Sequence, residues 1–209
     1  KKNFYHKNKI IFASGVSNSR NIKLKNFRRE LSLIKKFLKI NKNLTFYYFS
    51  SIDVLRRKKT PYIKHKIKIE KILNDSKNSV IIRLPQLVGF SKNKNTIFNY
   101  IKFKIKKIKS FEIYSNCFRN FIDVVDVIST VSAINKAKKK KKIYNLFYKE
   151  SIEIKSLVNY LELLLKKKAF FKIINKRDIF YKNLKNIKNG KNIIINRKYY
   201  YKKIFKKYI

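Results

Sequence analysis

Cysteine, proline, glycine and acidic residues are scarce in this chain of 209 residues. It contains one cysteine, two prolines, three glycines, 11 acidic residues and no methionine or tryptophan. The single cysteine, Cys117, cannot form an internal disulfide, which excludes a disulfide-stabilised secreted domain and favours a reducing, cytoplasmic setting. Because methionine is absent even from position 1, we expect the chain to be a fragment or a processed form.

Long hydrophobic runs are also absent. No apolar run approaches the ~20 residues that a membrane-spanning helix needs. The polar, basic start of the chain lacks the apolar core of a secretory signal. The two histidines, His6 and His65, are expected to face solvent. With a single cysteine elsewhere they form no set of metal ligands, so no metal site is predicted.

The net charge of +44 comes from 55 basic and 11 acidic residues. One interpretation is a surface that binds nucleic acid or an anionic membrane. The other is a compositional bias, because the enriched residue types (lysine, asparagine, isoleucine, phenylalanine and tyrosine) share AT-rich codons. The lysines are scattered over every segment instead of forming one stripe, which favours the bias. Weak, salt-sensitive binding to polyanions is then expected, without a specific nucleic-acid partner.

Buried strands alternate with amphipathic helices in the first part of the chain. Apolar runs at 9–13, 44–49 and 79–82 predict strands, and helical spacing predicts helices over 27–40 and from Thr60 to about Asn74. Strands and helices that alternate with short connections favour parallel pairing and a doubly wound α/β sheet.

The rest of the chain mixes both kinds of element. From residue 166 onward the sequence is low in complexity, and only a strand and a final short helix are predicted there. The expected elements are a helix at 96–110, strands at 111–114, 143–147 and 193–195, a segment that turns helical within 119–134, and a helix capped by Ser151 that runs to Leu165.

One predicted helix has an N-terminus suited to proton transfer. Thr60 is a good N-cap, and Pro61 suits the first helical position, where its missing N–H has no partner. Tyr62 and Lys66 then share one face of the helix. A nearby ammonium lowers the pKa of a phenol, and a tyrosine tuned in this way can exchange a proton with a carbonyl or alcohol oxygen. The spacing alone is unspecific, since it also occurs at Tyr5/Lys9, Tyr100/Lys104, Tyr181/Lys185 and Tyr199/Lys203.

The context of this helix distinguishes it from the other copies. The surrounding motifs are, in chain order, Ala13-Ser14-Gly15, Ser50-Ser51, the Tyr62–Lys66 helix, Arg83-Leu84-Pro85 with Gly89, Arg119 to Val127, and Ile143-Tyr144-Asn145-Leu146. This order resembles the extended short-chain dehydrogenase/reductase superfamily, in its NAD-dependent epimerase/dehydratase branch. The resemblance covers about Ile10 to Leu165, and its force lies in the joint order of the motifs.

The resemblance implies an architecture and an activity. The architecture is a Rossmann-like doubly wound parallel sheet, incomplete at its N-terminus, with a small C-terminal substrate-binding lobe. Residues 1–90 would form the C-terminal half of an NAD(P)-binding domain, and residues 91–209 a mixed lobe with elements that return to it. The implied activity is that of an NAD(P)-dependent epimerase/dehydratase-like protein acting on a nucleotide sugar, with NAD or NADP as cofactor.

Roles follow for individual residues. Tyr62 would be the acid/base at the substrate hydroxyl, and Lys66 would bind the nicotinamide ribose and depress the pKa of Tyr62. Ser51, or Ser50, would hydrogen-bond the reacting oxygen. Asp126 would be structural. The other implied contacts are to the cofactor, from Ser14, Gly15, Arg83 and Pro85, and to the substrate, from Gln86 and from Arg119, whose guanidinium suits a diphosphate.

The chain also departs from the family. It has no Gly-x-x-Gly-x-x-Gly turn to hold the dinucleotide pyrophosphate, its first long strand matches the family's fourth, and Asp123 replaces the usual histidine. Three alternatives stay open: a nucleotide-sugar enzyme, a catalytically degenerate relative that binds a nucleotide or a partner, and a basic nucleic-acid-binding protein, which the scatter of charge disfavours. The resemblance also allows a homodimer, because family members commonly pair through helices.

Overall fold

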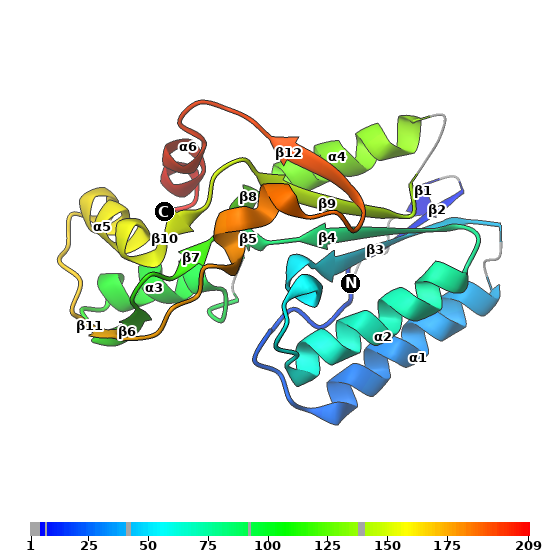
Figure 1. Cartoon of the computed structure of the whole chain (residues 1–209), viewed down its shortest axis with the longest axis horizontal. Coiled ribbons are helices and arrows are strands. Elements are labelled where there is room, and N and C mark those ends of the chain that lie inside the picture. The colour runs from blue at the N-terminus through cyan, green and yellow to red at the C-terminus, as the bar shows by residue number, and fades with distance from the viewer. Residues whose placement is uncertain (1–4, 7, 41–42, 92, 138–140) are drawn as a thin grey trace. The chain divides into compact units, whose positions relative to one another are not determined.

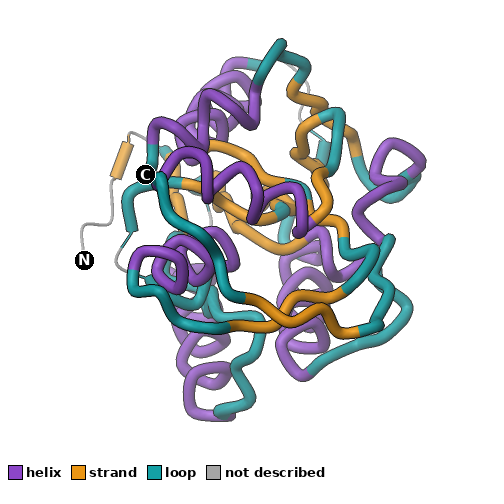
Figure 2. The backbone as a smooth tube through the Cα atoms, turned by 90° about the vertical axis from the view of Figure 1, so that its left-hand side faces the viewer, coloured by secondary structure: helices purple, strands orange, loops and turns teal. Residues whose placement is uncertain are grey.

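The computed structural model describes residues 5–6, 8–40, 43–91, 93–137 and 141–209. The chain divides into two compact units, which are described separately. The first lies within residues 1–84, 137–145 and 188–192, and the second within 85–136, 146–187 and 193–209. The first continuous segment of the first unit ends at Leu84. Helices and strands alternate along the sequence in both units (Figure 1, Figure 2).

The first unit is built on a mostly parallel sheet. Its strands lie in the order β1-β2-β3-β4-β9-β12. Strands β2, β3, β4 and β9 pair in parallel, whereas β1 is antiparallel to β2. The α/β class and the parallel pairing of the three predicted strands are therefore confirmed. The strand bounds are β1 (Tyr5–His6), β2 (Lys9–Phe12), β3 (Thr45–Ser51), β4 (Ser79–Leu84), β9 (Ile143–Tyr148) and β12 (Lys191–Ile195), and β9 and β12 both run on into residues of the second unit.

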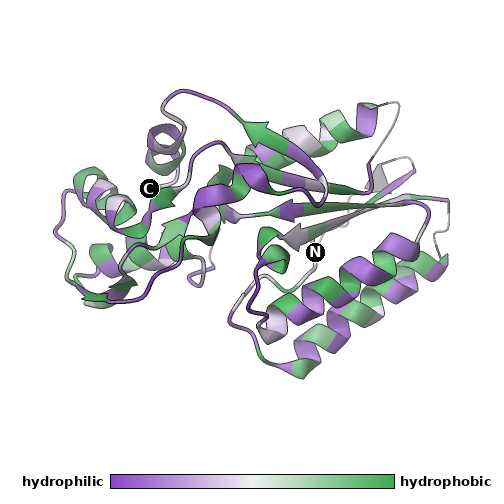
Figure 3. Ribbon diagram, viewed as in Figure 1, coloured by the Kyte–Doolittle hydropathy of each residue, from purple (hydrophilic) through white to green (hydrophobic). Residues whose placement is uncertain are grey.

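Two long helices, α1 (Leu24–Ile40) and α2 (Pro61–Asp75), lie on the same side of β2, β3 and β4 (Figure 1). The predicted start of α2 is confirmed, because the hydroxyl of Thr60 accepts a hydrogen bond from the N–H of Ile63 at 3.3 Å. A short 3₁₀ helix, η1 (Ile52–Leu55), connects β3 to the loop before α2. Hydrophobic and hydrophilic residues alternate along both long helices (Figure 3), which suits elements with one face on a sheet.

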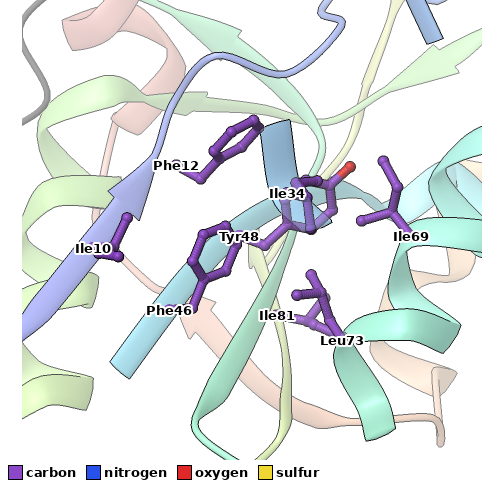
Figure 4. Close-up of a cluster of buried hydrophobic side chains, with 8 residues drawn as sticks. All are labelled: Ile10, Phe12, Ile34, Phe46, Tyr48, Ile69, Leu73 and Ile81. Carbon is purple, nitrogen blue, oxygen red and sulfur yellow. The ribbon is translucent and has the colours of Figure 1, made fainter. Parts of the chain in front are cut away.

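The core of this unit forms between the helices and that face of the sheet. Its buried members come from three strands and both helices, and Figure 4 shows them together: Ile10, Phe12, Ile34, Phe46, Tyr48, Ile69, Leu73 and Ile81. The ring of Phe12 packs against Phe46 and Tyr48, with centroids 5.7 and 6.2 Å apart. Burial of these rings against the isoleucine and leucine side chains of α1 and α2 fixes the two helices on the sheet.

The second unit contains several helices and three small two-stranded sheets. Strands β5 and β8 pair in parallel, as do β6 and β11, while β7 and β10 are antiparallel. Its aromatic core joins Phe98, Phe121 and Phe205, from α3, β8 and α6. The elements are β5 (Gln86–Val88), α3 (Ile97–Lys106), β6 (Phe111–Tyr114), β7 (Phe118–Arg119), β8 (Phe121–Asp123), α4 (Val124–Lys136), β10 (Ile152–Glu153), α5 (Ile154–Leu165), β11 (Phe171–Ile174), η2 (Phe180–Asn186) and α6 (Tyr200–Lys207).

Two expectations for this unit are corrected. Ser151 does not cap α5, since the N-cap position belongs to Glu153, and the Ser151 hydroxyl donates instead to the carbonyl of Tyr181 at 2.6 Å. The low-complexity segment after residue 166 holds more structure than its sequence predicts, because β11 and η2 both form there. Strand β11 becomes ordered through its pairing with β6, a contact that local sequence cannot indicate.

Within the described residues, no helix is long and apolar enough to cross a membrane. The same residues include no group of three or more His, Cys, Asp or Glu side chains that could hold a metal ion.

Candidate functional site

The candidate site lies in the first unit, where β2 and β3 end. Ser14 and Gly15 follow β2 after Ala13, and Ser51 is the last residue of β3. Because neighbouring parallel strands end at the same edge of a sheet, these residues share the edge at which open α/β sheets bind ligands. Helix α2 begins close by and contributes Tyr62 and Lys66, both buried, with exposed fractions of 8% and 2%.

The Ser51 side chain lies close enough to Tyr62 to lower its pKa. Burial, followed by the negative charges of Asp53 and Glu30, outweighs this effect, so the pKa of Tyr62 is raised. The expected depression of this pKa by Lys66 is therefore wrong. The ammonium nitrogen of Lys66 lies 5.7 Å from the centre of the Tyr62 ring and is committed elsewhere.

The Lys66 ammonium is bound by two buried side chains. Its Nζ donates to Oε1 of Glu30 at 3.0 Å and to the hydroxyl of Tyr48 at 2.8 Å. The Tyr48 hydroxyl in turn donates to the same Glu30 oxygen at 2.8 Å, which closes a triangle of three hydrogen bonds. Burial lowers the pKa of Lys66, while the Glu30 and Glu70 charges oppose that effect. A charged lysine is thus kept inside the unit by a carboxylate.

The second oxygen of Glu30 has two partners of its own. Oε2 accepts from the backbone N–H of Val16 at 2.7 Å and lies 3.1 Å from Nε2 of His65. Burial alone would raise the pKa of Glu30, but hydrogen bonds from His65, Val16 and Lys66 and the Lys66 charge outweigh it and hold the pKa at about 2. The expectation that His65 faces solvent is wrong, because its ring is buried and stacks on Phe27 with centroids 4.6 Å apart. The side chain of His6 lies outside the described residues.

Gly15 lies directly beside this network. A Cβ atom at position 15 would come within 2.8 Å of Oε1 of Glu30 and 3.1 Å of Nζ of Lys66. The glycine therefore leaves room for the ion pair to approach the backbone. The carbonyl of the preceding residue, Ser14, accepts a hydrogen bond from Arg29 at 2.9 Å. Helix α1 thus fixes the loop after β2 at two points, through Arg29 and Glu30.

Ser50 and Arg83 belong to a different network. The hydroxyl of Ser50 donates to Oε1 of Glu70 at 2.6 Å, so Ser51 and not Ser50 is the serine that acts on Tyr62. Arg83 binds the same carboxylate through Nε and Nη2, the latter at 2.6 Å, and reaches Asn189 through Nη1. Arg83 is only 4% exposed. Its place in an interior ion pair does not support a direct contact between its guanidinium and a cofactor.

Asp53 borders the Ser51–Tyr62 pair. The hydroxyl of Ser51 caps η1 by accepting from the N–H of Asp53 at 3.1 Å. The carboxylate of Asp53 forms an ion pair with Arg56 and raises the pKa of Tyr62 through its charge. An anion next to the phenol favours the protonated form, so Tyr62 carries its proton at neutral pH.

The remaining predicted residues lie in the second unit. Pro85 is buried between β4 and β5, and Gln86, at the start of β5, is half-buried with its N–H bonded to the carbonyl of Asn120. Arg119 forms an ion pair with Asp178 at 2.8 Å, and its guanidinium carbon lies 5.5 Å from the centre of the Tyr181 ring.

Asp123 and Asp126 stabilise the same unit. Asp123 accepts hydrogen bonds from Lys207 and Tyr208, both at the end of the chain, at 2.9 and 2.6 Å. Asp126 accepts from the hydroxyl of Tyr200 at 2.5 Å and pairs with Arg197. These contacts hold the C-terminal helix and agree with the structural role expected for Asp126.

Sequence reasoning missed Glu30, Tyr48 and Glu70, although one signal for Glu30 is visible. Glu30 falls on the apolar face of its helix, with Phe27 and Ile34 at helical spacing on either side. In a chain with only 11 acidic residues, a glutamate on that face indicates a buried partner of opposite charge.

Taken together, the residues can handle one proton in a water-poor edge of the sheet. A phenol beside a serine hydroxyl can donate a proton to, or accept one from, a ligand oxygen that both side chains bind. The neighbouring ammonium, fixed in position, can bind hydroxyl groups of a ligand. These are the capabilities of a site for alcohol and carbonyl chemistry.

The sequence matches no protein-family model and no curated protein. Solved structures do match. The dTDP-glucose 4,6-dehydratase of Bacillus anthracis, solved with NAD, is similar over 96% of this chain and 71% of its own, with a TM-score of 0.72 and 12% identity. The UDP-glucose 4-epimerase of Thermus thermophilus, also with NAD, is similar over 82% and 67%, with a TM-score of 0.65 and 11% identity.

A third match is the UDP-glucuronic acid 4-epimerase of Bacillus cereus, solved with UDP-glucuronic acid and NAD. It covers 93% of this chain and 67% of its own, with a TM-score of 0.66 and 17% identity. The chain thus spans about two thirds of the length of these proteins. At such low identity the likeness concerns the fold, and the chain has the Rossmann-like α/β fold of these NAD-dependent enzymes.

Proposed function

We propose that this protein is an NAD(P)-dependent epimerase- or dehydratase-like protein that acts on a nucleotide sugar. The observation that carries the proposal is the proximity of the Ser51 and Tyr62 side chains at the carboxyl edge of a parallel sheet. Lys66 lies one helical turn beyond Tyr62, next to the backbone of Gly15. The solved structures with the same fold that bind NAD and nucleotide sugars support the choice of ligands.

In this proposal Tyr62 moves the proton at a substrate hydroxyl, and Ser51 hydrogen-bonds the same oxygen. When bound, the nicotinamide would supply hydride acceptance and return. Because its pKa is raised, the Tyr62 phenol begins as a proton donor. To act as a base it needs a further positive charge close to its oxygen, which a nicotinamide ring in its oxidised form carries.

The donor set suits the nicotinamide end of such a cofactor. Lys66 has three N–H donors, and two of them go to Glu30 and Tyr48. The third is available in principle to a ribose hydroxyl. Ser14 and Gly15 would line the cleft beside it. The 209 residues contain no glycine-rich turn for the pyrophosphate, so this chain would supply the nicotinamide end of the site alone.

Residues of the second unit would contribute to substrate binding. Gln86 would face the sugar, and Arg119 would bind the diphosphate, for which its bidentate guanidinium is suited. Arg119 is at present paired with Asp178, so binding would require the phosphate to compete with that carboxylate. We assign Ser50 and Arg83 to support of the sheet through Glu70, and Pro85 to the connection between β4 and β5.

A second function is favoured by one observation, the ion pair between Lys66 and Glu30. If the ion pair with Glu30 prevents the Lys66 ammonium from binding a ligand hydroxyl, the protein is a degenerate relative that binds a nucleotide without turnover.

The test is to incubate the protein, as the cell makes it, with NAD or NADP and a panel of UDP-, dTDP- and GDP-sugars. Products are followed by mass spectrometry and by proton NMR of the sugar. A change in sugar configuration or loss of water, abolished by Tyr62→Phe, supports the enzyme. Nucleotide binding without any product supports the degenerate relative. A protein that binds neither cofactor nor nucleotide sugar contradicts both.

A further inference from the structure

The Glu30 carboxylate is completely buried, and all of its hydrogen-bond acceptor positions are filled. Its side chain is 0% exposed. A carboxylate can accept about four hydrogen bonds, and Glu30 has four partners, two at each oxygen: Lys66 and Tyr48 at Oε1, and Val16 and His65 at Oε2. It therefore has no capacity left for a ligand. Any effect of Glu30 on chemistry must pass through the groups that it binds.

Glu30 and the groups that it binds come from four separate elements. Glu30 projects from the middle of α1, Lys66 and His65 from α2, Tyr48 from β3, and Val16 from the loop after β2. The residues at each end of the Glu30–Lys66 bond are 36 positions apart in sequence. One carboxylate therefore determines how α1, α2, β3 and the Gly15 loop meet at the edge of the sheet.

An ion pair that only stabilised the fold would not need to lie at the carboxyl edge of the sheet, beside the backbone of Gly15. The pair lies against the backbone of Gly15, where even a Cβ atom would collide with it. The lysine so fixed is the one located a single helical turn from the Ser51–Tyr62 pair. Helix α2 carries three other lysines, Lys64, Lys68 and Lys71, and all three are exposed. Only the lysine at the carboxyl edge receives a buried anion, within the described residues of this helix.

We propose that Glu30 is a positioning residue: it holds the Lys66 ammonium and the Gly15–Val16 backbone in one arrangement, and thereby sets where Lys66 can bind a ligand hydroxyl. The use of Lys66 for a cofactor ribose rests on the proposed function, whereas the positioning itself does not. Tyr48 and His65 assist, because each fills one of the remaining acceptor positions of the carboxylate.

Other charged and titratable groups act on the same lysine. Glu70, on α2, also stabilises the Lys66 ammonium through its charge. Tyr62, on the same helix, and Tyr48, on β3, face the network from either side, and the charge of Glu30 raises the pKa of both phenols. Removing the Glu30 charge therefore lowers the pKa of Lys66, with Glu70 left as its remaining anion.

The test uses Glu30→Gln, which keeps the shape of the side chain and removes its charge. The matched control is Glu112→Gln, at an exposed glutamate of the second unit. The pKa of Lys66 is measured by NMR titration of its side-chain carbon next to Nζ, with the signal identified by its loss in Lys66→Met. We expect the Lys66 pKa to fall by a unit or more in Glu30→Gln, a tenfold shift in proton affinity, and to stay unchanged in Glu112→Gln.

An unchanged Lys66 pKa in folded Glu30→Gln overturns the proposal. Where turnover is measurable, Glu30→Gln should raise the KM for NAD(P) roughly tenfold or more and shift the alkaline limb of the pH profile downward, whereas lost stability alone would move neither. If the protein shows no turnover but the Lys66 pKa still falls, the positioning holds and the proposed enzyme fails.

A second measurement covers a variant that fails to fold. Amine-reactive labelling of the unaltered protein compares Lys66 with Lys64 and Lys68 on the same helix. We expect Lys66 to react at least about tenfold more slowly, since its ammonium is buried and ion-paired. The Tyr48→Phe variant, which keeps Glu30, should preserve that protection. Equal labelling of the three lysines, or loss of protection in Tyr48→Phe alone, contradicts a determining role for Glu30.

Discussion

The side chain of Ser51, the last residue of β3, lies beside that of Tyr62 in the first turn of α2 and acts to lower its pKa. The two residues meet because Thr60 and Pro61 start α2 close to the edge where β3 ends, and because η1 turns the chain between them.

The two serines should separate activity from stability. Ser51→Ala removes the hydroxyl beside Tyr62 that is proposed to bind the reacting oxygen, so turnover should slow roughly 10- to 100-fold. Ser50→Ala removes a donor from buried Glu70, so it should lower the free energy of unfolding by about 1–3 kcal/mol and leave kcat nearly unchanged. Steady-state kinetics and urea unfolding of both variants are the measurements. An equal fall in turnover in Ser51→Ala and Ser50→Ala would contradict a catalytic role for Ser51 that Ser50 lacks.

Tyr62→Phe should abolish proton transfer without disturbing the fold. The ring stays in place while the hydroxyl is lost, so turnover should fall by about 10²–10⁴-fold or more, with NAD(P) binding nearly unchanged. Tyr100→Phe is the matched control, because Tyr100 has the same spacing to Lys104, whose Nζ lies 5.6 Å from its ring centre. Lys66→Met should harm both binding and turnover. A Tyr62→Phe protein as active as Tyr100→Phe would leave only the binding function.

Local sequence determines much of this fold. The start of α2 follows from the Thr60 hydroxyl and the fixed backbone of Pro61, both of which act within a few residues. The strands at β2, β3 and β4 follow from short apolar runs between polar breaks. Parallel pairing then follows, because a helix connects each strand to the next.

The candidate site was harder to predict from the sequence than the fold. Alternation along β3 indicates that Ser50 and Ser51 point to opposite faces, but not which of them meets Tyr62, since that depends on the place of α2. Lys66 has the spacing of a catalytic residue, and its partner Glu30 is 36 positions away on another helix. His65 was expected outside because histidine is polar, whereas the Glu30 carboxylate inside the unit provides it with a partner.

Arg83 should prove to be a stability residue. Its guanidinium and the Glu70 carboxylate are both buried, so Arg83→Met leaves an uncompensated anion inside the unit. We expect the free energy of unfolding to fall by about 3–5 kcal/mol. The control is Lys149→Met, which breaks a more exposed pair with Glu150, 3.5 Å apart, and should cost less than about 1 kcal/mol. If Arg83→Met instead weakens NAD(P) binding at unchanged stability, Arg83 contacts the cofactor as the family resemblance implies.

The large positive charge should give only unspecific binding to polyanions. With 55 basic and 11 acidic residues, association with DNA should be independent of sequence and should weaken steeply between about 50 and 200 mM salt. Fluorescence anisotropy with two unrelated duplexes across a salt series is the measurement. A complex that discriminates between the duplexes and persists at high salt would make nucleic-acid recognition the function.

Glu30 should make the protein sensitive to acid. Its pKa is about 2 in the folded protein, against an ordinary value of 4.5. Because the folded value is the lower one, the carboxylate stabilises the fold fully above pH 4.5, and this contribution disappears as the pH falls from 4.5 toward 2. The two values differ by enough to correspond to roughly 3 kcal/mol. Glu30→Gln has no carboxyl to protonate, so its stability should lack this part of the pH dependence.

Urea unfolding of the unaltered protein and of Glu30→Gln at a series of pH values between 5 and 2 tests this directly. The unaltered protein should start more stable and lose its advantage across that interval, because protonation of Glu30 breaks the same bonds to Lys66, His65 and Val16 that the substitution weakens. Glu112→Gln, at an exposed carboxyl, should follow the unaltered protein at every pH. Two parallel curves for the unaltered protein and Glu30→Gln would mean that the Glu30 carboxylate is not held in its charged form by these partners.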